Sequence, residues 1–225
     1  MNVSTQTVRN GLKKTGLKSI VDVKKPLLPN RHVQQRLGFC KKYINWTVED
    51  WKSIIWSDEY KINRVWADGC KYCWKIGNYK HQTELLSQHA QPTVKFWGGS
   101  LMIWGCMSMH RVVNLVRIDI SLDAELYCKI LEEVLPFIVG FYGDEFKNFI
   151  FQHHNDPKHT SKKVTKWLAD NEIEDLEWPE QSTDLNPIEH LWGHLKRRLA
   201  AYDSAPTSIH ALWERLEKEW NNIPS

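Results

Sequence analysis

The chain has 225 residues, 42% of them hydrophobic and 25% charged, which is the balance of a soluble globular protein with one sizeable domain and an appendage. No stretch of eighteen or more apolar residues is present, so the sequence predicts no membrane-spanning helix. The N-terminal residues lack the apolar segment of a secretory signal, so we expect an intracellular protein.

The net charge of +3 conceals an asymmetry along the chain. Residues 1–42 contain ten Lys or Arg and one acid, so they carry +9, and the remaining residues therefore carry −6. A basic arm joined to a mildly acidic body predicts that the arm meets a polyanion. The alternative is that these side chains form a solvated basic face.

The five cysteines are scattered, and only Cys70 and Cys73 lie close together in the sequence. A zinc site would need a second Cys or His pair at similar spacing, and none follows. We interpret the cysteines as reduced thiols of an intracellular protein, with metal or redox use as the less favoured alternative.

The first predicted element is a short helix over residues 3–16, which Ser4 or Thr5 can cap at its start. It is too short to form a domain, and it looks like the last helix of a module whose earlier part is absent. Residues 17–30 carry two prolines and predict an extended linker. Residues 31–46 resume helical spacing. Their apolar positions are Val33, Leu37 and Cys40.

The body of the protein is expected to begin near Trp46. Its apolar segments predict strands over residues 53–56, 71–76, 100–108, 111–120, 148–152 and 173–178. Gly98, Gly99 and Gly105 mark turns or places of close backbone approach. Helical periodicity predicts helices over residues 123–139, with Pro136 near the end, and over 161–170, 186–200 and 208–223. Several strands followed by alternating helices and strands indicate an α/β fold with a mixed central sheet flanked by helices.

The helix over residues 186–200 has the strongest amphipathic pattern in the chain. Asn186 can cap it, and Pro187 suits its first turn. Its apolar positions follow helical spacing: Ile188, Leu191, Trp192, Leu195 and Leu199.

Three acids occupy positions that such a fold could bring together. Asp58 follows the buried strand 53–56, Asp156 lies just beyond the strand 148–152, and Glu189 lies in the first helical turn after Pro187. A cluster of carboxylates is what two divalent cations need for phosphoryl transfer. For each acid taken alone, surface solvation is the simpler interpretation.

Four separated motifs, in the right order, resemble the transposases of the Tc/mariner superfamily. They are VSTQTVRNGLKKTGLKS (3–19), IIWSDEYKI (54–62), FWGGSLMIWGCMS (96–108) and the segment from NDPKHT to HLKRRL (155–199). The resemblance covers nearly the whole chain. It implies a ribonuclease-H-like catalytic domain whose Asp, Asp, Glu triad binds two Mg²⁺ ions. It also implies a helix-turn-helix pair that reads terminal inverted repeats in duplex DNA, cut-and-paste transposition into TA sites, and work in the nucleus.

The family's catalytic positions fall on Asp58 of WSDE and on Glu189 of NPIEHLW. The family pattern Q-D-N-D-P-K-H-T places the second aspartate two residues before the aspartate of DPKHT, and here that position is His154. Thirty-four residues separate His154 from Glu189, as in the family, whereas thirty-two separate Asp156 from Glu189. The resemblance therefore predicts that Asp58, His154 and Glu189 converge at one edge of the sheet as the metal position.

Histidine is a poor substitute at that position, because Mg²⁺ prefers oxygen ligands in tight octahedral geometry and a protonated imidazole repels a cation. Mn²⁺ tolerates nitrogen better. We expect weak metal binding and impaired or absent catalysis. The alternatives are rescue by Asp156 and a site that tolerates histidine.

The resemblance also sets the expected domains. Residues 1–18 correspond to a remnant of the second helix-turn-helix module, 19–45 to a basic linker and helix, and 46–225 to the catalytic domain, with the N-terminal part of the family's DNA-binding region absent. A smaller departure is Thr183, where the family has proline. A homodimer is a further expectation.

The basic arm supplies the expected DNA contacts. Phosphate contacts are predicted for Lys13, Lys14, Lys24, Lys25 and Arg31, and contacts with base edges for Gln6, Thr7 and Arg9. Two alternatives to an impaired transposase remain. One is a non-catalytic DNA-binding protein derived from a transposase; the other is a ribonuclease-H-like nuclease of another lineage, which the transposase-like linker GLKS…KKPLL disfavours.

Overall fold

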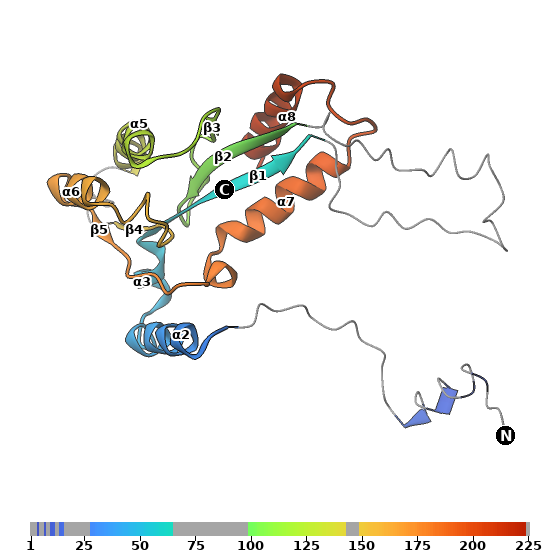
Figure 1. Ribbon diagram of the computed structural model, residues 1–225, viewed down its shortest axis with the longest axis horizontal. Coiled ribbons are helices and arrows are strands. Elements are labelled where there is room, and N and C mark those ends of the chain that lie inside the picture. Colours follow the sequence, from blue (N-terminus) through green and yellow to red (C-terminus); the bar gives the residue numbers. More distant parts are fainter. Residues whose placement is uncertain are drawn as a thin grey trace.

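The computed structural model describes residues 28–64, 99–142 and 149–223, together with Ser4, Thr7, Asn10, Gly11, Lys14 and Thr15. The described helices are α2 (Asn30–Lys42), α3 (Val48–Lys52), α5 (Ala124–Tyr142), α6 (Lys162–Asp170), α7 (Ile188–Ala200) and α8 (Ile209–Asn221). The described strands are β1 (Ile54–Asn63), β2 (Ser100–Met107), β3 (Val116–Ile118), β4 (Ile150–Gln152) and β5 (Glu174–Asp175), and η3 (Thr183–Leu185) is a short 3₁₀ turn (Figure 1).

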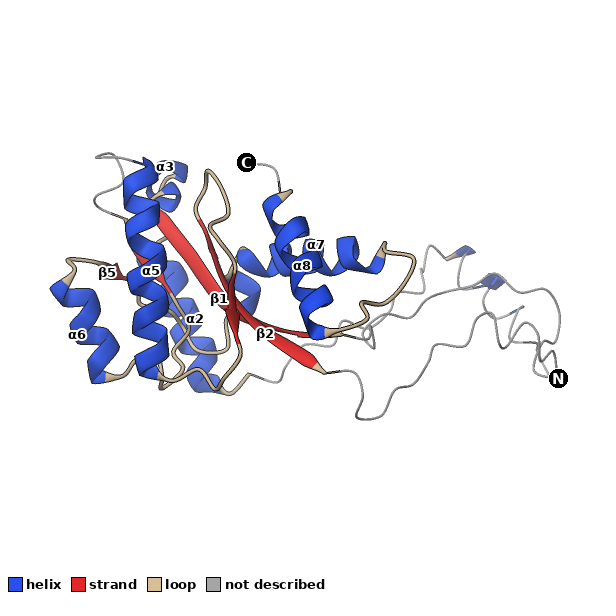
Figure 2. Cartoon of the chain, turned by 90° about the horizontal axis from the view of Figure 1, so that it is seen from above, coloured by secondary structure: helices blue, strands red, loops and turns tan. Residues whose placement is uncertain are grey.

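The five described strands form one mixed sheet in the order β3-β2-β1-β4-β5. β1 pairs antiparallel with β2, which pairs antiparallel with β3, whereas β4 runs parallel to both β1 and β5. Helices cover both faces of this sheet, with α5 and α6 on one side and α7 and α8 on the other (Figure 2). The predicted α/β architecture, a mixed central sheet flanked by helices, is confirmed.

Each face of the sheet has its own hydrophobic core. Trp104, Tyr127, Leu131 and Phe151 are fully buried on the side of α5 and α6. On the other side, α7 and α8 bury another set against β1 and β2. That set includes Ile62, Ile103, Trp192, Leu195, Leu212, Leu216 and Trp220. Because both faces are covered, the strands are held rigidly and can position side chains at their ends.

β1 is longer than the sequence predicted. The predicted strand ended at Trp56, but β1 continues to Asn63 because it pairs along its whole length with β2. Asp58 therefore lies within the strand instead of following it, directly opposite Gly105 of β2. Gly105 was predicted to mark a turn or a close backbone approach; it lies within β2, and the ring of Trp192 lies against it.

Other boundaries also differ from the prediction. β3 and β5 are three and two residues long, within predicted strands of ten and six residues. α5 continues past Pro136, which was expected near its end and instead lies inside the helix. The strand predicted over residues 71–76, together with Cys70 and Cys73, lies outside the described residues. The described helices include none that is long and apolar enough to cross a membrane.

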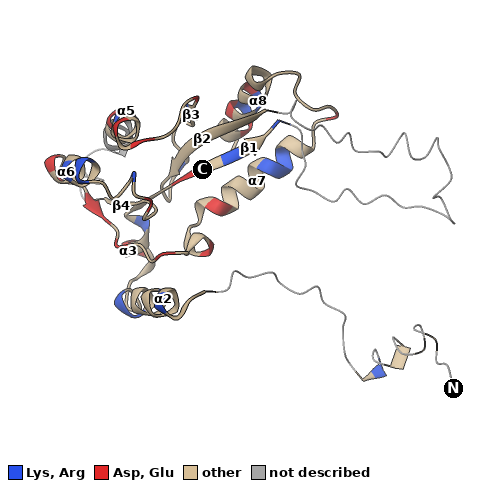
Figure 3. Cartoon of the chain, in the orientation of Figure 1, with Lys and Arg blue, Asp and Glu red and all other residues tan. Residues whose placement is uncertain are grey.

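α2 packs beside the body of the protein instead of extending from it. Phe39 and Tyr43 join Trp51, Trp56 and Trp178 in an aromatic cluster. The predicted apolar positions face the other way: Val33 and Leu37 are 43% and 45% exposed, and Cys40 is exposed. Besides this aromatic packing, ion pairs join basic residues of α2 to the acidic segment between β5 and α7 (Figure 3).

The starts of two predicted helices can be compared with the structure. The Ser4 hydroxyl accepts a hydrogen bond from the Thr7 amide, as expected of a cap. α7 begins at Ile188, one residue later than predicted, with Pro187 at the capping position. Asn186 still acts at this end, because its side-chain oxygen accepts a hydrogen bond from the Ile188 amide.

Candidate active site

The parallel pairing of β1 and β4 brings two predicted site residues together. Trp56 lies opposite Gln152, so the chain two residues beyond each of them places Asp58 beside His154. The His154 Nε2 atom lies 2.8 Å from Asp58 Oδ1. Asp58 is 7% exposed and the His154 side chain 23% exposed, so the pair is shielded from water without being sealed.

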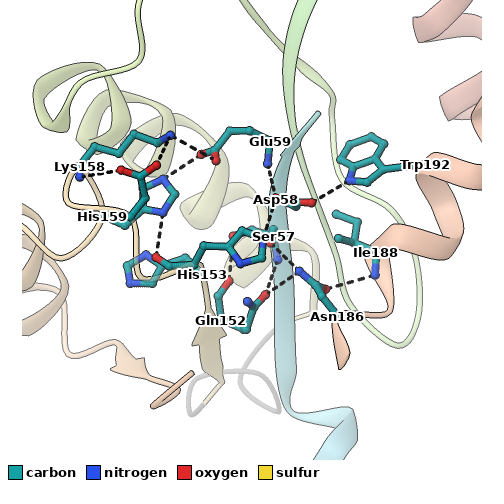
Figure 4. Close-up of polar contacts among 12 residues, drawn as sticks. Ser57, Asp58, Glu59, Gln152, His153, Lys158, His159, Asn186, Ile188 and Trp192 are labelled. Atoms are coloured by element: carbon teal, nitrogen blue, oxygen red, sulfur yellow. Dashed lines mark hydrogen bonds and ion pairs between the residues drawn. The ribbon is translucent and has the colours of Figure 1, made fainter. Parts of the chain in front are cut away.

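Both oxygens of the Asp58 carboxylate are already engaged. Oδ1 pairs with His154 and also accepts a hydrogen bond from the Glu59 amide at 2.8 Å. Oδ2 accepts a hydrogen bond from the indole N–H of Trp192 at 3.2 Å (Figure 4). Trp192 lies one helical turn after Glu189 in α7, so this bond ties the helix that carries Glu189 to Asp58.

Glu189 lies in the first turn of α7, one helical turn before Trp192, whose indole reaches Asp58. Burial raises the pKa of Glu189, and the nearby Asp58 carboxylate raises it further. Burial alone would lower the pKa of His154, but the hydrogen bond to Asp58 and the charges of Asp58, Glu59 and Glu189 outweigh burial and raise it. The structure joins Asp58 to His154 directly and to the helix of Glu189 through Trp192, while the metal and catalytic roles of Asp58, His154 and Glu189 stay predictions.

Asn186 links the elements that carry these residues. Its side-chain amide donates hydrogen bonds to the Ser57 carbonyl at 3.1 Å and to Gln152 Oε1 at 3.2 Å. Ser57 precedes Asp58 in β1, and Gln152 ends β4 two residues before His154 (Figure 4). The buried Asn186 thus joins β1, β4 and the start of α7 through one side chain.

A second ion-pair group lies on the other face of β1. The Glu59 carboxylate is 2.8 Å from His159 Nε2 and 3.6 Å from Lys158 Nζ. Burial raises the pKa of Glu59, but the hydrogen bond and charge of His159 outweigh it, and the pKa is lowered. The other ring nitrogen of His159 contacts the His154 carbonyl oxygen at 3.0 Å, so this group holds the turn that carries His154.

Sequence reasoning gave no role to Glu59, although a signal was present. Successive residues of a strand point to opposite faces, so the adjacent acids of SDE had to serve two different sites. His153 is likewise structural. It contacts the Tyr127 hydroxyl at 3.1 Å and Asp175 at 3.3 Å, and stacks on His159 with 5.2 Å between ring centroids.

Asp156, the alternative metal ligand, already has an ion-pair partner. Its carboxylate pairs with Lys158 Nζ at 3.1 Å and is 47% exposed. Although partial burial opposes it, the Lys158 contacts lower the pKa of Asp156. Asp156 and His154 both line an open cleft of about 350 Å³ that Trp178 and residues 179–183 close on the other side. A larger cleft of about 590 Å³, lined by residues 113–117, lies away from the acids described here.

This donor set does not fit a pair of Mg²⁺ ions. His154 offers an imidazole nitrogen instead of carboxylate oxygens, and this imidazole is already paired with the Asp58 carboxylate. Two dications also need a negatively charged centre, and a histidine at position 154 supplies one carboxylate fewer than the family pattern. Among residues 28–64, 99–142 and 149–223, no group of three or more His, Cys, Asp or Glu side chains is arranged to hold a metal.

The predicted DNA contacts fall mostly outside the described residues. That is the case for Gln6, Arg9, Lys13, Lys24 and Lys25. Thr7 and Lys14 are helical and exposed. Arg31 pairs with Glu180 at 2.6 Å, although its side chain is still 70% exposed. A phosphate would therefore compete with a carboxylate for Arg31.

Comparison with known families decides the identity of the chain. Residues 80–221 match the family model described as DDE superfamily endonuclease, and residues 1–45 match a transposase helix-turn-helix model. The chain is 37% identical over 223 residues to the Tcb1 transposase of Caenorhabditis briggsae, and 36% identical over 222 residues to the Tc1 transposase of Caenorhabditis elegans. The chain belongs to the Tc/mariner superfamily of DDE transposases. It covers 78% of each of these two relatives, and 98% of the chain is aligned with each.

Solved Tc/mariner transposase structures have the same fold. A Mos1 transposase paired-end complex with the left transposon end has a TM-score of 0.74 and 21% identity. A pre-cleavage Mos1 transpososome has a TM-score of 0.76 and 20% identity. The chain spans 64% and 65% of these two Mos1 chains. Other Mos1 paired-end complexes are described with Mn and with Mg, consistent with the use of divalent metals in this family.

Proposed function

We propose that this chain is a Tc/mariner-type transposase domain for cut-and-paste DNA transposition whose catalytic steps are impaired. The family relationship and the fold support this proposal, in which Asp58 and Glu189 would serve strand cleavage and integration at TA. The replacement of the second carboxylate by His154 removes the oxygen ligands that two Mg²⁺ ions would share. Any residual activity should favour Mn²⁺, which accepts nitrogen ligands more readily.

One contact carries this proposal: His154 Nε2 lies 2.8 Å from Asp58 Oδ1. His154 does more than lack a carboxylate, because its imidazole also pairs with the Asp58 carboxylate that a metal would need. Asp156 offers no replacement in this arrangement, since its carboxylate pairs with Lys158 on the exposed side of the turn.

The proposed partner is double-stranded DNA carrying transposon terminal inverted repeats, and the proposed location is the nucleus. The helix-turn-helix match over residues 1–45 and the +9 charge of residues 1–42 support DNA binding. Homodimer formation is proposed on the family relationship alone.

The test is nicking of supercoiled DNA in Mg²⁺ and then in Mn²⁺ by four proteins: wild type, His154→Asp, Asp156→Asn and Glu189→Gln. We expect little cleavage by wild type in Mg²⁺ and no change with Asp156→Asn. We expect His154→Asp to improve Mg²⁺ binding and, where DNA is correctly positioned, cleavage. Robust wild-type nicking in Mg²⁺ that disappears with Glu189→Gln would show that the site is active and the proposal wrong.

A second candidate function is a non-catalytic DNA-binding protein derived from a transposase. The Asp58–His154 pair favours it, because the imidazole gives the buried Asp58 carboxylate a partner within the protein. The two functions separate in the same assay. A binding protein shows salt-dependent DNA affinity with no cleavage in either metal, whereas an impaired transposase retains cleavage that Glu189→Gln removes.

A further inference from the structure

Arg36 makes an unusually complete set of contacts for a residue of the helix that precedes the catalytic body. Its guanidinium donates to both oxygens of Asp184, at 2.7 Å each, in a bidentate pair. It also donates to the Gln181 carbonyl and the Ser182 hydroxyl, at 3.0 Å each. The Arg36 side chain is only 20% exposed. One side chain of α2 therefore holds four acceptor atoms of residues 181–184.

Residues 181–184 have a backbone that needs such support. Gln181 has a φ of 54°, a left-handed backbone conformation that residues other than glycine rarely adopt. The next residue, Ser182, is 2% exposed, and its carbonyl accepts a hydrogen bond from the Leu185 amide as η3 forms. A planar guanidinium that holds the Gln181 carbonyl and the Asp184 carboxylate together fixes both ends of this turn.

The turn leads directly to the candidate site. Asn186 follows η3 and donates to Ser57 of β1 and Gln152 of β4, while accepting from the Ile188 amide. Glu189 and Trp192 then follow in the first turns of α7, and the Trp192 indole bonds to Asp58. Hydrogen bonds joined by short stretches of backbone thus connect α2 to the carboxylate at the centre of the site.

We propose that Arg36 is a positioning residue, which acts through residues 181–186 to set the start of α7 against Asp58. This inference rests on the proposed function, because it gives Arg36 a role in shaping the same candidate site. It makes α2, the last part of the basic segment 1–42, part of the support of the site. The docking of α2 and the geometry of the acids are then mechanically linked.

Other ion pairs of α2 provide the comparison. Lys42 pairs with Glu177 at 2.6 Å, but the two side chains are 51% and 79% exposed, and each makes a point contact. An exposed pair of this kind holds a helix weakly and transmits little. Lys42→Ala therefore removes one cation of α2 without touching residues 181–186, and it is the matched control for Arg36→Ala.

The experiment follows two indole N–H signals in ¹H–¹⁵N spectra of the whole chain, assigned with Trp178→Phe and Trp192→Phe. Trp178 packs on Phe39 of α2 with 5.3 Å between ring centroids and reports local docking. Trp192 bonds to Asp58 and reports the site. We expect Arg36→Ala to shift both signals and to speed amide exchange at Ile188 and Glu189 by roughly tenfold or more. We expect Lys42→Ala to shift only Trp178.

Two milder variants keep the test decisive where Arg36→Ala unfolds the protein. Arg36→Lys keeps the charge but loses the planar guanidinium that bonds several acceptors at once. The Trp192 signal of this variant should therefore stay shifted from its wild-type position. Asp184→Asn keeps the shape of the Asp184 side chain, which is 64% exposed, but removes its charge. The Trp192 signal should shift in this variant by less than in Arg36→Ala. An unchanged Trp192 signal in these variants, with Trp178 shifted, would overturn the proposal and reduce Arg36 to a docking contact. These readouts need neither metal nor cleavage, so their failure is distinct from failure of the proposed function.

Discussion

The ring of Trp192 lies where a side chain at position 105 would be. A Cβ added to Gly105 would come within 2.8 Å of the Trp192 Cη2 atom and within 3.2 Å of the Trp220 ring. Gly105 also lies directly opposite Asp58 in the pairing of β1 with β2. Trp192 can therefore reach the Asp58 carboxylate only because position 105 has no side chain.

Replacing Gly105 should accordingly disturb both the core and the site. We expect Gly105→Ala to lower the free energy of unfolding by about 1–3 kcal/mol, because the buried rings cannot move aside without cost. Gly38→Ala, in the exposed middle of α2 with nothing within 4 Å, is the control and should raise stability by about 0.5–1 kcal/mol. Urea denaturation measures both. Equal stability of the two variants would contradict the close approach of Trp192.

The His154–Asp58 pair predicts how stability responds to Mg²⁺. His154→Asp removes an imidazole and places two carboxylates side by side, which should lower stability in EDTA by roughly 1.5–3 kcal/mol, the worth of a hydrogen bond to a charged group. Millimolar Mg²⁺ should then raise the melting temperature of His154→Asp by binding the folded state. Wild type should not respond.

His154→Gln is the control for that measurement, because it breaks the ion pair without adding a carboxylate. Its melting temperature should fall and should not recover in Mg²⁺. A wild-type protein whose melting temperature rises with Mg²⁺ as steeply as that of His154→Asp would show that the imidazole does not block metal binding.

Glu219 predicts an acid-dependent contribution to stability. Its carboxylate, 7% exposed, accepts hydrogen bonds from Arg198 and from the Tyr202 hydroxyl, at 2.8 Å each. Burial raises the pKa of Glu219, but these two bonds and the Arg198 charge outweigh burial and lower it. A lowered pKa stabilises the fold above the unfolded-state value of about 4.3, and that stabilisation is lost as the pH falls through the folded-state pKa.

Glu219→Gln should therefore lower the free energy of unfolding by about 1–3 kcal/mol at neutral pH. The difference from wild type should shrink as the pH is lowered below about 4. Chemical denaturation across pH 3 to 7, roughly the range in which carboxylates titrate, measures this. Glu214→Gln, which affects a pair with His210 that is mostly exposed, should change stability by less than about 0.5 kcal/mol.

The basic arm predicts the salt dependence of DNA binding. Replacing Lys24 and Lys25 with alanine should reduce the slope of log affinity against log salt by about 0.9 for each phosphate that the arm no longer neutralises. Lys162 and Lys163, adjacent lysines of α6, form the control pair, and their replacement should leave the slope nearly unchanged. Fluorescence anisotropy with duplex DNA over a salt series gives the slopes. A control pair that lowers the slope as much would move the contact surface away from the arm.

The sequence predicted elements well where the periodicity of a single segment determines the structure. α6, α7 and α8 have apolar faces at helical spacing, and each lies within two residues of its predicted bounds. The sequence predicted the length of a strand poorly where pairing with a distant strand determines that length. β1 extends through the polar residues 57–61 only because β2 lies alongside, and no local pattern contains that information.

The same distinction applies to the candidate site. The positions of Asp58, His154 and Glu189 could be read from motifs. The roles of Glu59 and Arg36 could not, because each depends on a partner about one hundred or more residues away in the sequence. The buried face of α2 was missed for a related reason. Phe39 and Tyr43, not the predicted positions Val33, Leu37 and Cys40, pack on the body, and the same side of the helix pairs with Glu180 and Asp184.

The pairing of β1 with β4 has a consequence for folding. Ile54 lies beside Ile150, and the Asp58–His154 contact depends on this parallel pair, so the site closes only after a very long segment of chain has been brought together. Closing such a loop is entropically unfavourable until other contacts have formed, which makes pairings of this kind slow. The backbone hydrogen bonds of helices α6, α7 and α8 are local in sequence, so these helices can form earlier. The acidic centre should therefore be among the last parts to acquire native structure during synthesis and refolding.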